Sequence, residues 1–532
     1  MTNGMYRIPT SIKTLMTVFL IVTFSHNPAK AQRISSAPML GSYFDMMVTG
    51  NYESASFFWN RAAQDRSAKF GIKYENIPLK IDCTSPIVQN LKVMKEYLQP
   101  PVKRYEDLFD GKYQKLFYSA IVRGKQVEHT YFAEFDGKYY WLAYPQDVYA
   151  GDWPIKESEY FRLHVHPDLE KFCNYIMFEE ADRFVAQLGD TLGLSEYDMR
   201  HLQSVKIDFY YCNSDEQVLE ITGQKTRGVY DKASSDIISS FFPHNHEVVH
   251  LLVDYRMRQL PLFVLPLLEE GLAVHYGGRW GKSTESLMPL GIYLYNEGLV
   301  TLDSLLSYQG FKSSAESDLA YPLAALFNRF VLERTDKEKY LALYRKLSGS
   351  YQELSVLPVD SVKTRILRTL SMSTWDQLVA AFNDYLKSYK TNQYVAVPGN
   401  SGKGEKLIDN KSAVVRNDGD WLEFEFNAES EPKGNLLFGH DTQSKVAVSA
   451  MFTEHYGEET PYEGYRYGVR YDANEAGLYD YATNMLLAKY IAGVDPSPDY
   501  FNQQNHKITV RIKKNLTNGI LPAENDYKLL DH

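Results

Sequence analysis

Residues 243–257 read PHNHEVVHLLVDYRM, and this stretch carries the most specific chemistry in the chain. His246 and His250 are four residues apart, so on a helix their imidazoles converge on one point. That spacing suits two protein ligands of a catalytic zinc, and Glu247 between them suits the general base of a metal-assisted hydrolase. Valines and leucines supply an apolar face, and Pro243 suits a helix start. The stretch therefore predicts a helix that carries half of a metal site.

A second stretch, LPLLEEGLAVHYGG at residues 265–278, predicts a short helix suited to supply a third ligand. It opens with a proline and closes with two glycines, the usual signals for the start and end of a helix. Charged side chains on an apolar helix are rarely buried unless they are paired or coordinated, so Glu269 and Glu270 are the candidates. Neighbouring residues point about 100° apart around a helix, so only one glutamate can face a metal. In the first helix, His244 points away from His246 and is expected to be a capping or surface residue.

Together the motifs HEVVH and EGLA resemble the gluzincin group of zinc metallopeptidases, over roughly residues 160–390. In that group the third ligand is a glutamate on a second helix, commonly directly before Gly-x-Ala. The resemblance therefore implies Glu270 as the ligand, with Glu269 as the alternative. Two features depart from the family pattern. The GxMEN signature of aminopeptidases is absent, and Val274 stands where thermolysin-like enzymes have an aspartate that orients a histidine ligand.

The resemblance also implies a mechanism and a partner. One Zn²⁺ with three protein ligands keeps a position open for water. Glu247 would take the proton of that water and pass it to the leaving amine of a peptide or protein substrate. A hydrogen-bond donor would stabilise the tetrahedral oxyanion. Tyr321, in a later helical region, is the favoured candidate, and Tyr276 and His275 are the others.

Two strand-like stretches precede the first motif. Residues 205–212, VKIDFYYC, alternate as in a strand, and residues 226–231, TRGVYD, resemble a shorter one. In such peptidases an edge strand beside the active-site helix binds the substrate backbone in extended form. Gly228, Val229 and Tyr230 are the residues expected to do so.

The 532-residue chain predicts a multidomain α+β protein. A helical pattern followed by strands suits an N-terminal α+β module, NTF2-like or cystatin-like, with a hairpin turn at Asp136-Gly137. A gluzincin-like unit follows, with a mixed β-sheet and helices that include the amphipathic stretch 318–347. Short strands with turn signals predict an all-β sandwich at the C-terminus. The predicted domains are a signal peptide at 1–31, the N-terminal module at 40–155, the catalytic unit at 160–390 and the sandwich at 400–532.

The C-terminal region is predicted to follow a linker or an exposed entry segment at residues 395–412, which is rich in Gly, Ser and Lys. The expected strands lie at 421–429, 436–441, 445–452, 465–473 and 506–515. Trp421 and the tyrosines of this region suit stacking on sugars, although core packing is the commoner role of such side chains. A glycan contact is therefore a possible partner interaction of this region.

The N-terminus predicts export. Arg7 and Lys13 precede a short apolar core at residues 15–24, and an A-x-A cleavage site ends at Ala31. The core is too short for an ordinary spanning helix, and no later apolar stretch is long enough. We expect a periplasmic or extracellular mature protein with no membrane span.

The composition of the chain argues against some classes of protein. The formal net charge of −10 argues against binding to nucleic acid, which needs clustered Lys and Arg. Cys83, Cys173 and Cys212 allow at most one disulfide, so stability must come from large cores. Two alternatives to a peptidase stay open. One is a scaffold that binds zinc without turnover, and the other is a secreted carbohydrate- or surface-binding protein that acts through its C-terminal sandwich.

Overall fold

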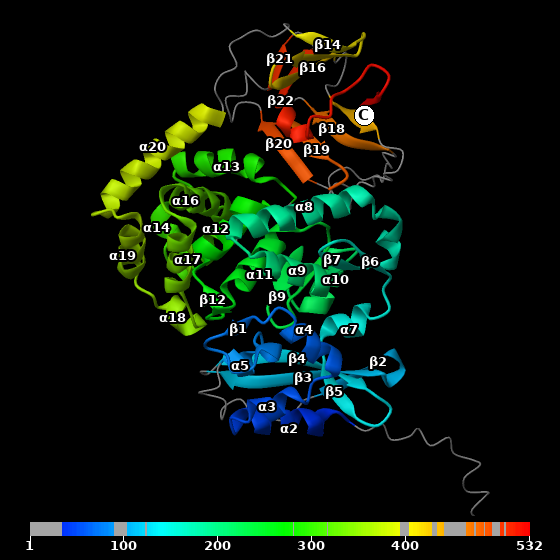
Figure 1. Ribbon diagram of the computed structural model, residues 1–532, viewed down its shortest axis with the longest axis vertical. Coiled ribbons are helices and arrows are strands. Elements are labelled where there is room, and N and C mark those ends of the chain that lie inside the picture. Colours follow the sequence, from blue (N-terminus) through cyan, green and yellow to red (C-terminus); the bar gives the residue numbers. More distant parts are fainter. Residues whose placement is uncertain are drawn as a thin grey trace, which may run out of the picture. The chain divides into compact units, whose positions relative to one another are not determined.

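The computed structural model describes residues 35–89, 104–122, 125–279, 281–315, 318–393, 404–427, 433–440, 464–472, 475–483, 485–491, 501–504 and 507–531 (Figure 1). The chain forms two compact units, one within Met1–Asn60 and Lys92–Ala143 and the other within Arg61–Leu91 and Tyr144–His532. The second unit includes residues 61–91 and 144–155, which the sequence predicted as part of an N-terminal domain. It also includes the predicted catalytic and sandwich regions. The predicted signal peptide at 1–31 lies outside the described residues.

The first unit combines helices with a four-stranded antiparallel sheet. Its elements are α2 (Ala37–Val48), α3 (Tyr52–Ser56), η3 (Phe109–Gly111) and, in sheet order, β2 (Arg104–Leu108), β3 (Tyr113–Val122), β4 (Lys125–Phe135) and β5 (Tyr140–Ala143). Leu40, Tyr43, Phe44 and Met47 recur at helical spacing in α2 and are buried. The ring of Phe44 lies 5.0 Å from that of Tyr118 in β3, so α2 packs on the sheet.

The predicted hairpin turn at Asp136-Gly137 is confirmed. Phe135 of β4 pairs with Tyr140 of β5 across the turn. The Asp136 carboxylate accepts the backbone N–H of Tyr139 at 2.7 Å, which is the usual role of aspartate in a tight turn. Gly137 has a φ of 99°, a conformation that a side chain would disfavour.

In the second unit, a mixed five-stranded sheet lies beside the predicted site. Its order is β6 (Ile155–Glu157), β7 (Phe161–Val165), β8 (Ile207–Tyr211), β10 (Asp236–Ser239) and β9 (Gly228–Asp231). Strands β7, β8 and β10 are parallel, and β9 runs antiparallel to β10 at the edge. Every residue of β8 is buried, as expected for a central parallel strand covered on both faces. The strands predicted at 205–212 and 226–231 are confirmed as β8 and β9.

Helices make up most of the rest of this region. They are α4 (Arg61–Ala68), η1 (Lys80–Asp82), α5 (Pro86–Gln89), α7 (Pro145–Ala150), η4 (Pro167–Phe172), α8 (Tyr175–Leu192), α9 (Glu196–Val205), α10 (Asp215–Thr222), α11 (Asn245–Met257), α12 (Pro266–Gly277), α13 (Thr284–Asn296), α14 (Leu302–Leu305), α15 (Tyr308–Ala315), α16 (Ala320–Arg334), α17 (Lys337–Lys346), α18 (Tyr351–Ser355), α19 (Val359–Leu370) and α20 (Trp375–Gln393). Two short strand pairs are β1 (Lys73–Tyr74) with β11 (Gln259–Leu260) and β12 (Phe263–Val264) with β13 (Ser348–Gly349). Helix α12 packs against both α11 and α16 (Figure 1).

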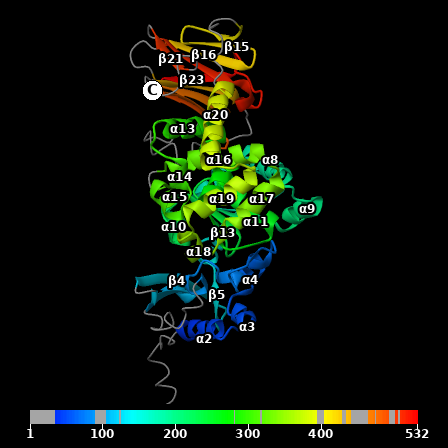
Figure 2. The same cartoon turned by 90° about the vertical axis from the view of Figure 1, so that its left-hand side faces the viewer.

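The C-terminal region is all β apart from the short η6 (Lys514–Thr517) among the described residues. One antiparallel sheet has the order β14 (Glu405–Asp409), β15 (Ala413–Asp418), β16 (Trp421–Asn427), β22 (Lys507–Lys513) and β21 (Phe501–Gln504). The other has the order β20 (Met485–Ile491), β19 (Glu475–Asp480), β18 (Tyr465–Tyr471), β17 (Gly434–His440) and β23 (Tyr527–Asp531). Both sheets contribute to one apolar core, for example Phe424 from the first and Phe438 from the second, and the two layers are visible in Figure 2.

Some expectations for this region need correction. The predicted linker at 395–412 is wrong for Glu405–Asp409, because Ile408 is buried in the sandwich core and β14 pairs with β15. Tyr467 and Tyr471 lie in the same core, so they pack rather than offer a face to a sugar. The strand predicted at 445–452 lies outside the described residues.

The sandwich packs against the helical region within the second unit. Ile176 of α8 shares an apolar cluster with Leu437 and Leu486 of the sandwich. The Arg466 guanidinium lies 2.6 Å from the Glu180 carboxylate of α8. The segment after α12 also pairs with β20, because the Ser283 N–H donates to the Leu486 carbonyl at 3.0 Å.

Two chain-wide properties complete the fold. Cys83, Cys173 and Cys212 are all free thiols, so the second unit is held by its cores. Among the described helices, none is both long and apolar enough to cross a bilayer.

Candidate metal centre

Helix α11 carries the HEVVH motif in a buried position. Apolar side chains lie on most of its circumference, and Val248, Leu251 and Leu252 are fully buried. Apolar residues all round a helix are typical of one inside a core. His246 is only 2% exposed, and Glu247 is 8% exposed. The motif therefore belongs to an interior helix, where an imidazole or a carboxylate needs a partner.

Helix α12 carries the second motif and approaches α16 closely. Pro266 occupies its first turn, as predicted. A Cβ added to Gly271 would lie 2.1 Å from the Asn328 amide nitrogen and 2.7 Å from the Ala324 carbonyl oxygen, both in α16. Asn328 in turn donates to the Leu267 carbonyl of α12 at 2.6 Å. The glycine after Glu270 thus has a packing role, since it lets the two helices approach.

The structure brings His246, His250 and Glu270 together. Their side chains each offer one ligand atom, and these atoms all lie within 4.8 Å of one another. The two Nε2 atoms are 3.2 Å apart, and Glu270 Oε2 lies 3.1 Å from His246 Nε2 and 3.8 Å from His250 Nε2. Ligands about 2.0–2.2 Å from a tetrahedral zinc are separated by roughly 3.3 Å. The spacing of the three atoms therefore fits a zinc ion.

A backbone carbonyl orients the first histidine. His246 Nδ1 lies 3.1 Å from the carbonyl oxygen of Gly278, just beyond α12. A carbonyl can only accept, so in a neutral imidazole Nδ1 carries the proton and Nε2 carries a lone pair. In this tautomer the Nε2 lone pair faces the Glu270 carboxylate, an arrangement that a proton on Nε2 or a metal ion between the two groups would relieve. The same second contact is typical of histidines that bind metals.

Gly278 itself cannot readily be another residue. Its φ of 71° lies in the left-handed region, and an added Cβ would lie 2.1 Å from the Lys282 carbonyl oxygen. The two glycines were predicted as a helix end, and α12 does end there. They also place the Gly278 carbonyl where it accepts a hydrogen bond from His246 Nδ1. The helix-end signal in the sequence does not reveal this role.

The two neighbouring glutamates of α12 have different partners. Glu269 Oε1 lies 2.7 Å from Lys232 Nζ, and Lys232 also donates to the Leu262 carbonyl at 2.9 Å. Glu269 is therefore neutralised by a lysine, while Glu270 faces the two histidines. This is the separation expected from their 100° offset around a helix.

Glu247 lies beside the edge strand β9. Its Oε2 accepts the backbone N–H of Tyr230 at 2.8 Å, and its Oε1 lies 3.8 Å from His244 Nε2. Burial raises the pKa of the Glu247 carboxyl above its usual value. A carboxylate in this environment is suited to take up a proton.

The expectation for His244 was partly wrong. It occupies the N-cap position of α11, but its side chain makes no capping hydrogen bond and is buried. Instead His244 Nδ1 lies 2.9 Å from the Ser239 hydroxyl of β10, under Gly228. A Cβ at Gly228 would lie 2.2 Å from this imidazole, so the small residue lets the edge strand approach α11.

The predicted substrate strand has the expected place in the sheet. Gly228, Val229 and Tyr230 form β9, with its outer edge unpaired by any described strand. The outward N–H of Tyr230 donates to Glu247 rather than pointing into open space. One backbone donor of this edge is thus used by the protein itself.

Tyr321 and an arginine lie next to the ligand cluster. The Arg279 guanidinium carbon is 3.3 Å from the centroid of the Tyr321 ring, and Arg279 Nη1 is 3.9 Å from Glu270 Oε2. Burial, followed by the charge of Glu270, raises the pKa of the Tyr321 hydroxyl, which therefore stays a donor. Sequence reasoning missed Arg279, because it follows the helix-ending glycines and belongs to no periodic pattern.

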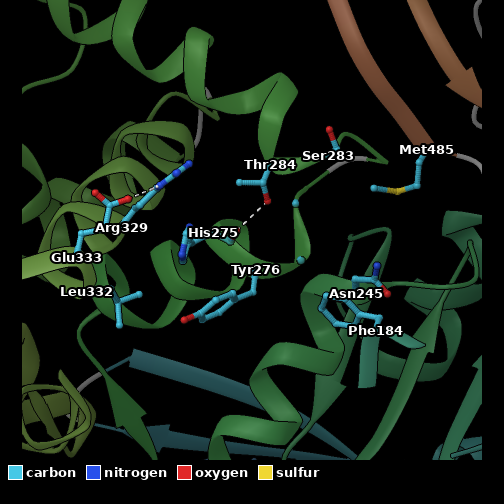
Figure 3. Close-up of a pocket in the computed structure, with 12 residues that line it drawn as sticks. Phe184, Asn245, His275, Tyr276, Ser283, Thr284, Arg329, Leu332, Glu333 and Met485 are labelled. Carbon is cyan, nitrogen blue, oxygen red and sulfur yellow. Dashed lines mark hydrogen bonds and ion pairs between the residues drawn. The ribbon is translucent and has the colours of Figure 1, made fainter. Parts of the chain in front are cut away.

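The other two oxyanion candidates point elsewhere. His275 and Tyr276 line a separate cavity together with Arg329 of α16 (Figure 3). Tyr321 and Arg279 are therefore better placed than His275 and Tyr276 to meet a ligand at the cluster.

Comparison of the chain with protein families, with curated proteins and with solved structures finds no match.

Proposed function

We propose that this chain is a zinc-dependent hydrolase of peptide bonds, with His246, His250 and Glu270 as the metal ligands. The observation that carries the proposal is the convergence of their three ligand atoms within 4.8 Å, next to a buried Glu247. Two imidazole nitrogens and one carboxylate oxygen are a donor set that zinc takes in catalytic sites. The assignment of a peptidase follows the resemblance to gluzincins.

The donor set supports one zinc ion. The Gly278 carbonyl presents the lone pair of His246 to the cluster, and Lys232 keeps Glu269 away from it. When bound, zinc would polarise a substrate carbonyl and bring the pKa of a bound water towards about 7. Three protein ligands leave room for that water.

Glu247 is the proposed proton carrier. The Tyr230 N–H fixes the direction of its carboxylate, and burial raises its affinity for a proton. It would accept a proton from the attacking water and then donate it to the leaving amine. This step needs no other titratable side chain at the site.

Substrate contacts are proposed for β9 and for the pair of Arg279 and Tyr321. An extended peptide beside β9 would lie along the strand that already touches Glu247. The guanidinium of Arg279 and the hydroxyl of Tyr321 are donors suited to the oxyanion that forms on the substrate carbonyl. Export to the periplasm or the extracellular space is proposed from residues 1–31 alone.

The test compares wild type with Glu247→Gln on a peptide library read by mass spectrometry, with zinc content measured on the same samples. We expect wild type to cleave and to hold about one zinc per chain. Glu247→Gln should keep its zinc and lose about 10²–10⁴-fold in rate, the usual contribution of a general acid–base group.

Glu196→Gln is the matched control, because Glu196 is an exposed helical glutamate in α9. It should cleave as wild type does. Zinc-loaded wild type that cleaves nothing would favour the scaffold without turnover, and an unchanged rate in Glu247→Gln would refute the role of that residue.

A further inference from the structure

A cavity lies at the C-terminal end of α12, and the proposed chemistry does not use it. Its volume is about 600 Å³, enough for a small organic molecule. Figure 3 shows Asn245 of α11, His275 of α12 and Arg329 of α16 around it, with Met485 of β20 on the sandwich side. The walls come from α8, α11, α12, α13, α16 and β20 of the second unit.

Two buried polar atoms at this cavity have no protein partner among the described residues. They are Asn245 Oδ1 and His275 Nδ1. Burial, with a smaller effect of Arg329, lowers the pKa of His275 to about 4, so its imidazole is neutral near pH 7. Buried polar atoms usually have hydrogen-bond partners, so two such atoms on residues that line one cavity favour a polar occupant.

A charged pair forms another wall. Arg329 Nε donates to Glu333 Oε1 at 2.8 Å, one turn apart on α16. Glu333 Oε1 also lies 3.4 Å from the Tyr385 hydroxyl. The cavity therefore offers a cation that suits a carboxylate and an anion that suits an ammonium group, side by side.

Apart from Ser283, Thr284 and two glycines, the other residues of the wall are apolar or aromatic. Phe184, Leu332 and Met485 line it, together with the ring of Tyr276. An occupant that matches the whole surface has one apolar end and one end with both charges.

We propose that this cavity binds a short zwitterion, a dipeptide with an apolar side chain. Arg329 would bind its carboxylate and Glu333 its ammonium group, while Asn245 Oδ1 and neutral His275 would pair with its remaining polar groups. The side chain would lie on Phe184. This inference stands apart from the proposed peptidase activity, because it uses none of the metal ligands or Glu247.

The position of the cavity links it to the metal centre. Asn245 directly precedes His246, and the cavity is also lined by Gly278, whose carbonyl holds His246. A bound dipeptide would therefore contact the backbone that supports the first ligand.

The test is isothermal titration calorimetry on the full chain after zinc has been removed by chelation, so that no probe is cleaved or bound through the metal. The probes are Ala-Leu, N-acetyl-Ala-Leu and Ala-Leu amide. We expect Ala-Leu to bind and each blocked probe to bind at least about tenfold more weakly, since each loses one charge-assisted contact.

Two variants assign the contacts. Arg329→Gln should lower the affinity for Ala-Leu at least about tenfold, so that Ala-Leu and Ala-Leu amide bind equally well. Glu333→Gln should lower it by a similar factor, so that Ala-Leu and N-acetyl-Ala-Leu bind equally well. Arg200→Gln is the control, because Arg200 forms a similar one-turn pair with Glu196 on an exposed helix. Its affinity should equal that of wild type.

Three results would overturn the proposal. The first is a folded wild type, by circular dichroism, that binds none of the probes, which would leave only water in the cavity. The second is equal binding of all three probes. The third is tight binding that survives in both Arg329→Gln and Glu333→Gln, which would place the dipeptide elsewhere.

Discussion

Two clusters of buried or partly buried ionisable side chains in the second unit differ in how their charges are balanced. In the first, Lys69 Nζ lies 2.7 Å from Asp208 and 3.4 Å from Asp236, and Arg66 lies 3.5 Å from Asp236. Asp236 also accepts a hydrogen bond from Gln146 at 2.8 Å. Each buried carboxylate there meets a cation from the chain itself.

In the second cluster, His246 Nε2, His250 Nε2 and Glu270 Oε2 lie 3.1–3.8 Å from one another. The Arg279 guanidinium approaches this cluster, with its Nη1 3.9 Å from Glu270 Oε2. Buried charges are normally paired or bound to metals. The first cluster is therefore complete as a structural network, whereas the donor set of the second suits the cation that we propose for it.

The largest expected effect is loss of a carboxylate from the complete cluster. Asp236→Ala should lower the free energy of unfolding by about 3–5 kcal/mol, because Lys69 and Arg66 would lose a fully buried partner. Urea denaturation measures it. Asp65→Ala, which removes an exposed pair with Arg61, should change stability by less than about 1 kcal/mol. Equal effects of the two substitutions would contradict the claim that the buried network contributes more to stability than the exposed Arg61–Asp65 pair.

Zinc should stabilise the folded protein through the second cluster and not through the first. Free zinc at about 100 times its Kd should raise the free energy of unfolding of wild type by about 2.7 kcal/mol relative to chelator-treated protein. Asp236→Ala should show the same gain, whereas His250→Ala should lose most of it. Thermal denaturation with and without chelator makes the comparison, and a gain that persists in His250→Ala would place the ion at another site.

Acid should weaken the complete cluster. Burial raises the pKa of the Asp208 carboxyl, but Lys69 and His164 lower it more, so the net shift is downward. A carboxyl with a lowered folded-state pKa stabilises the fold above its unfolded pKa of about 3.9, and this stability is lost as the pH falls further. Between pH 5 and 3, wild type should lose about 1–2 kcal/mol more stability than Asp208→Asn.

Unfolding by urea at each pH measures the acid effect, and Asp168→Asn, at an exposed carboxylate, should leave the wild-type slope in place. A slope that is unchanged in Asp208→Asn would mean that other carboxyls carry the acid sensitivity.

The smallest effect is expected for Glu270→Gln in zinc-free protein. Removing the Glu270 charge should change stability by no more than about 1 kcal/mol in either direction, because the attraction to Arg279 and the repulsion from the histidine lone pairs are lost together. Urea denaturation in chelator measures it. A loss near that of Asp236→Ala would show that the second cluster is balanced without a metal.

Much of the site could be predicted from local spacing. The interval of four residues between His246 and His250 places both imidazoles on one helix face, and the proline and glycine signals mark α12 at its observed ends. Such features depend on neighbours along the chain, which a sequence displays directly. The strand β9 was predictable for the same reason.

What could not be predicted depends on contacts between distant segments. Lys232 selects which glutamate is neutralised, and Arg279 lies on Tyr321, but neither cation belongs to a motif. The boundary between the two compact units could not be predicted either. Residues 61–91 join the second unit through buried contacts, such as the one between Lys69 and Asp208. Tertiary pairing of this kind leaves no periodic pattern.

The central claim is that His246, His250 and Glu270 bind one zinc ion. Its most direct test is a titration of chelator-stripped protein with zinc in competition with a chromogenic chelator. The account predicts one zinc per chain, an affinity at least about 100-fold lower in Glu270→Ala, and a far smaller change in Glu269→Gln, whose side chain faces Lys232. No zinc bound by wild type, or a loss of affinity in Glu269→Gln that matches Glu270→Ala, would contradict it.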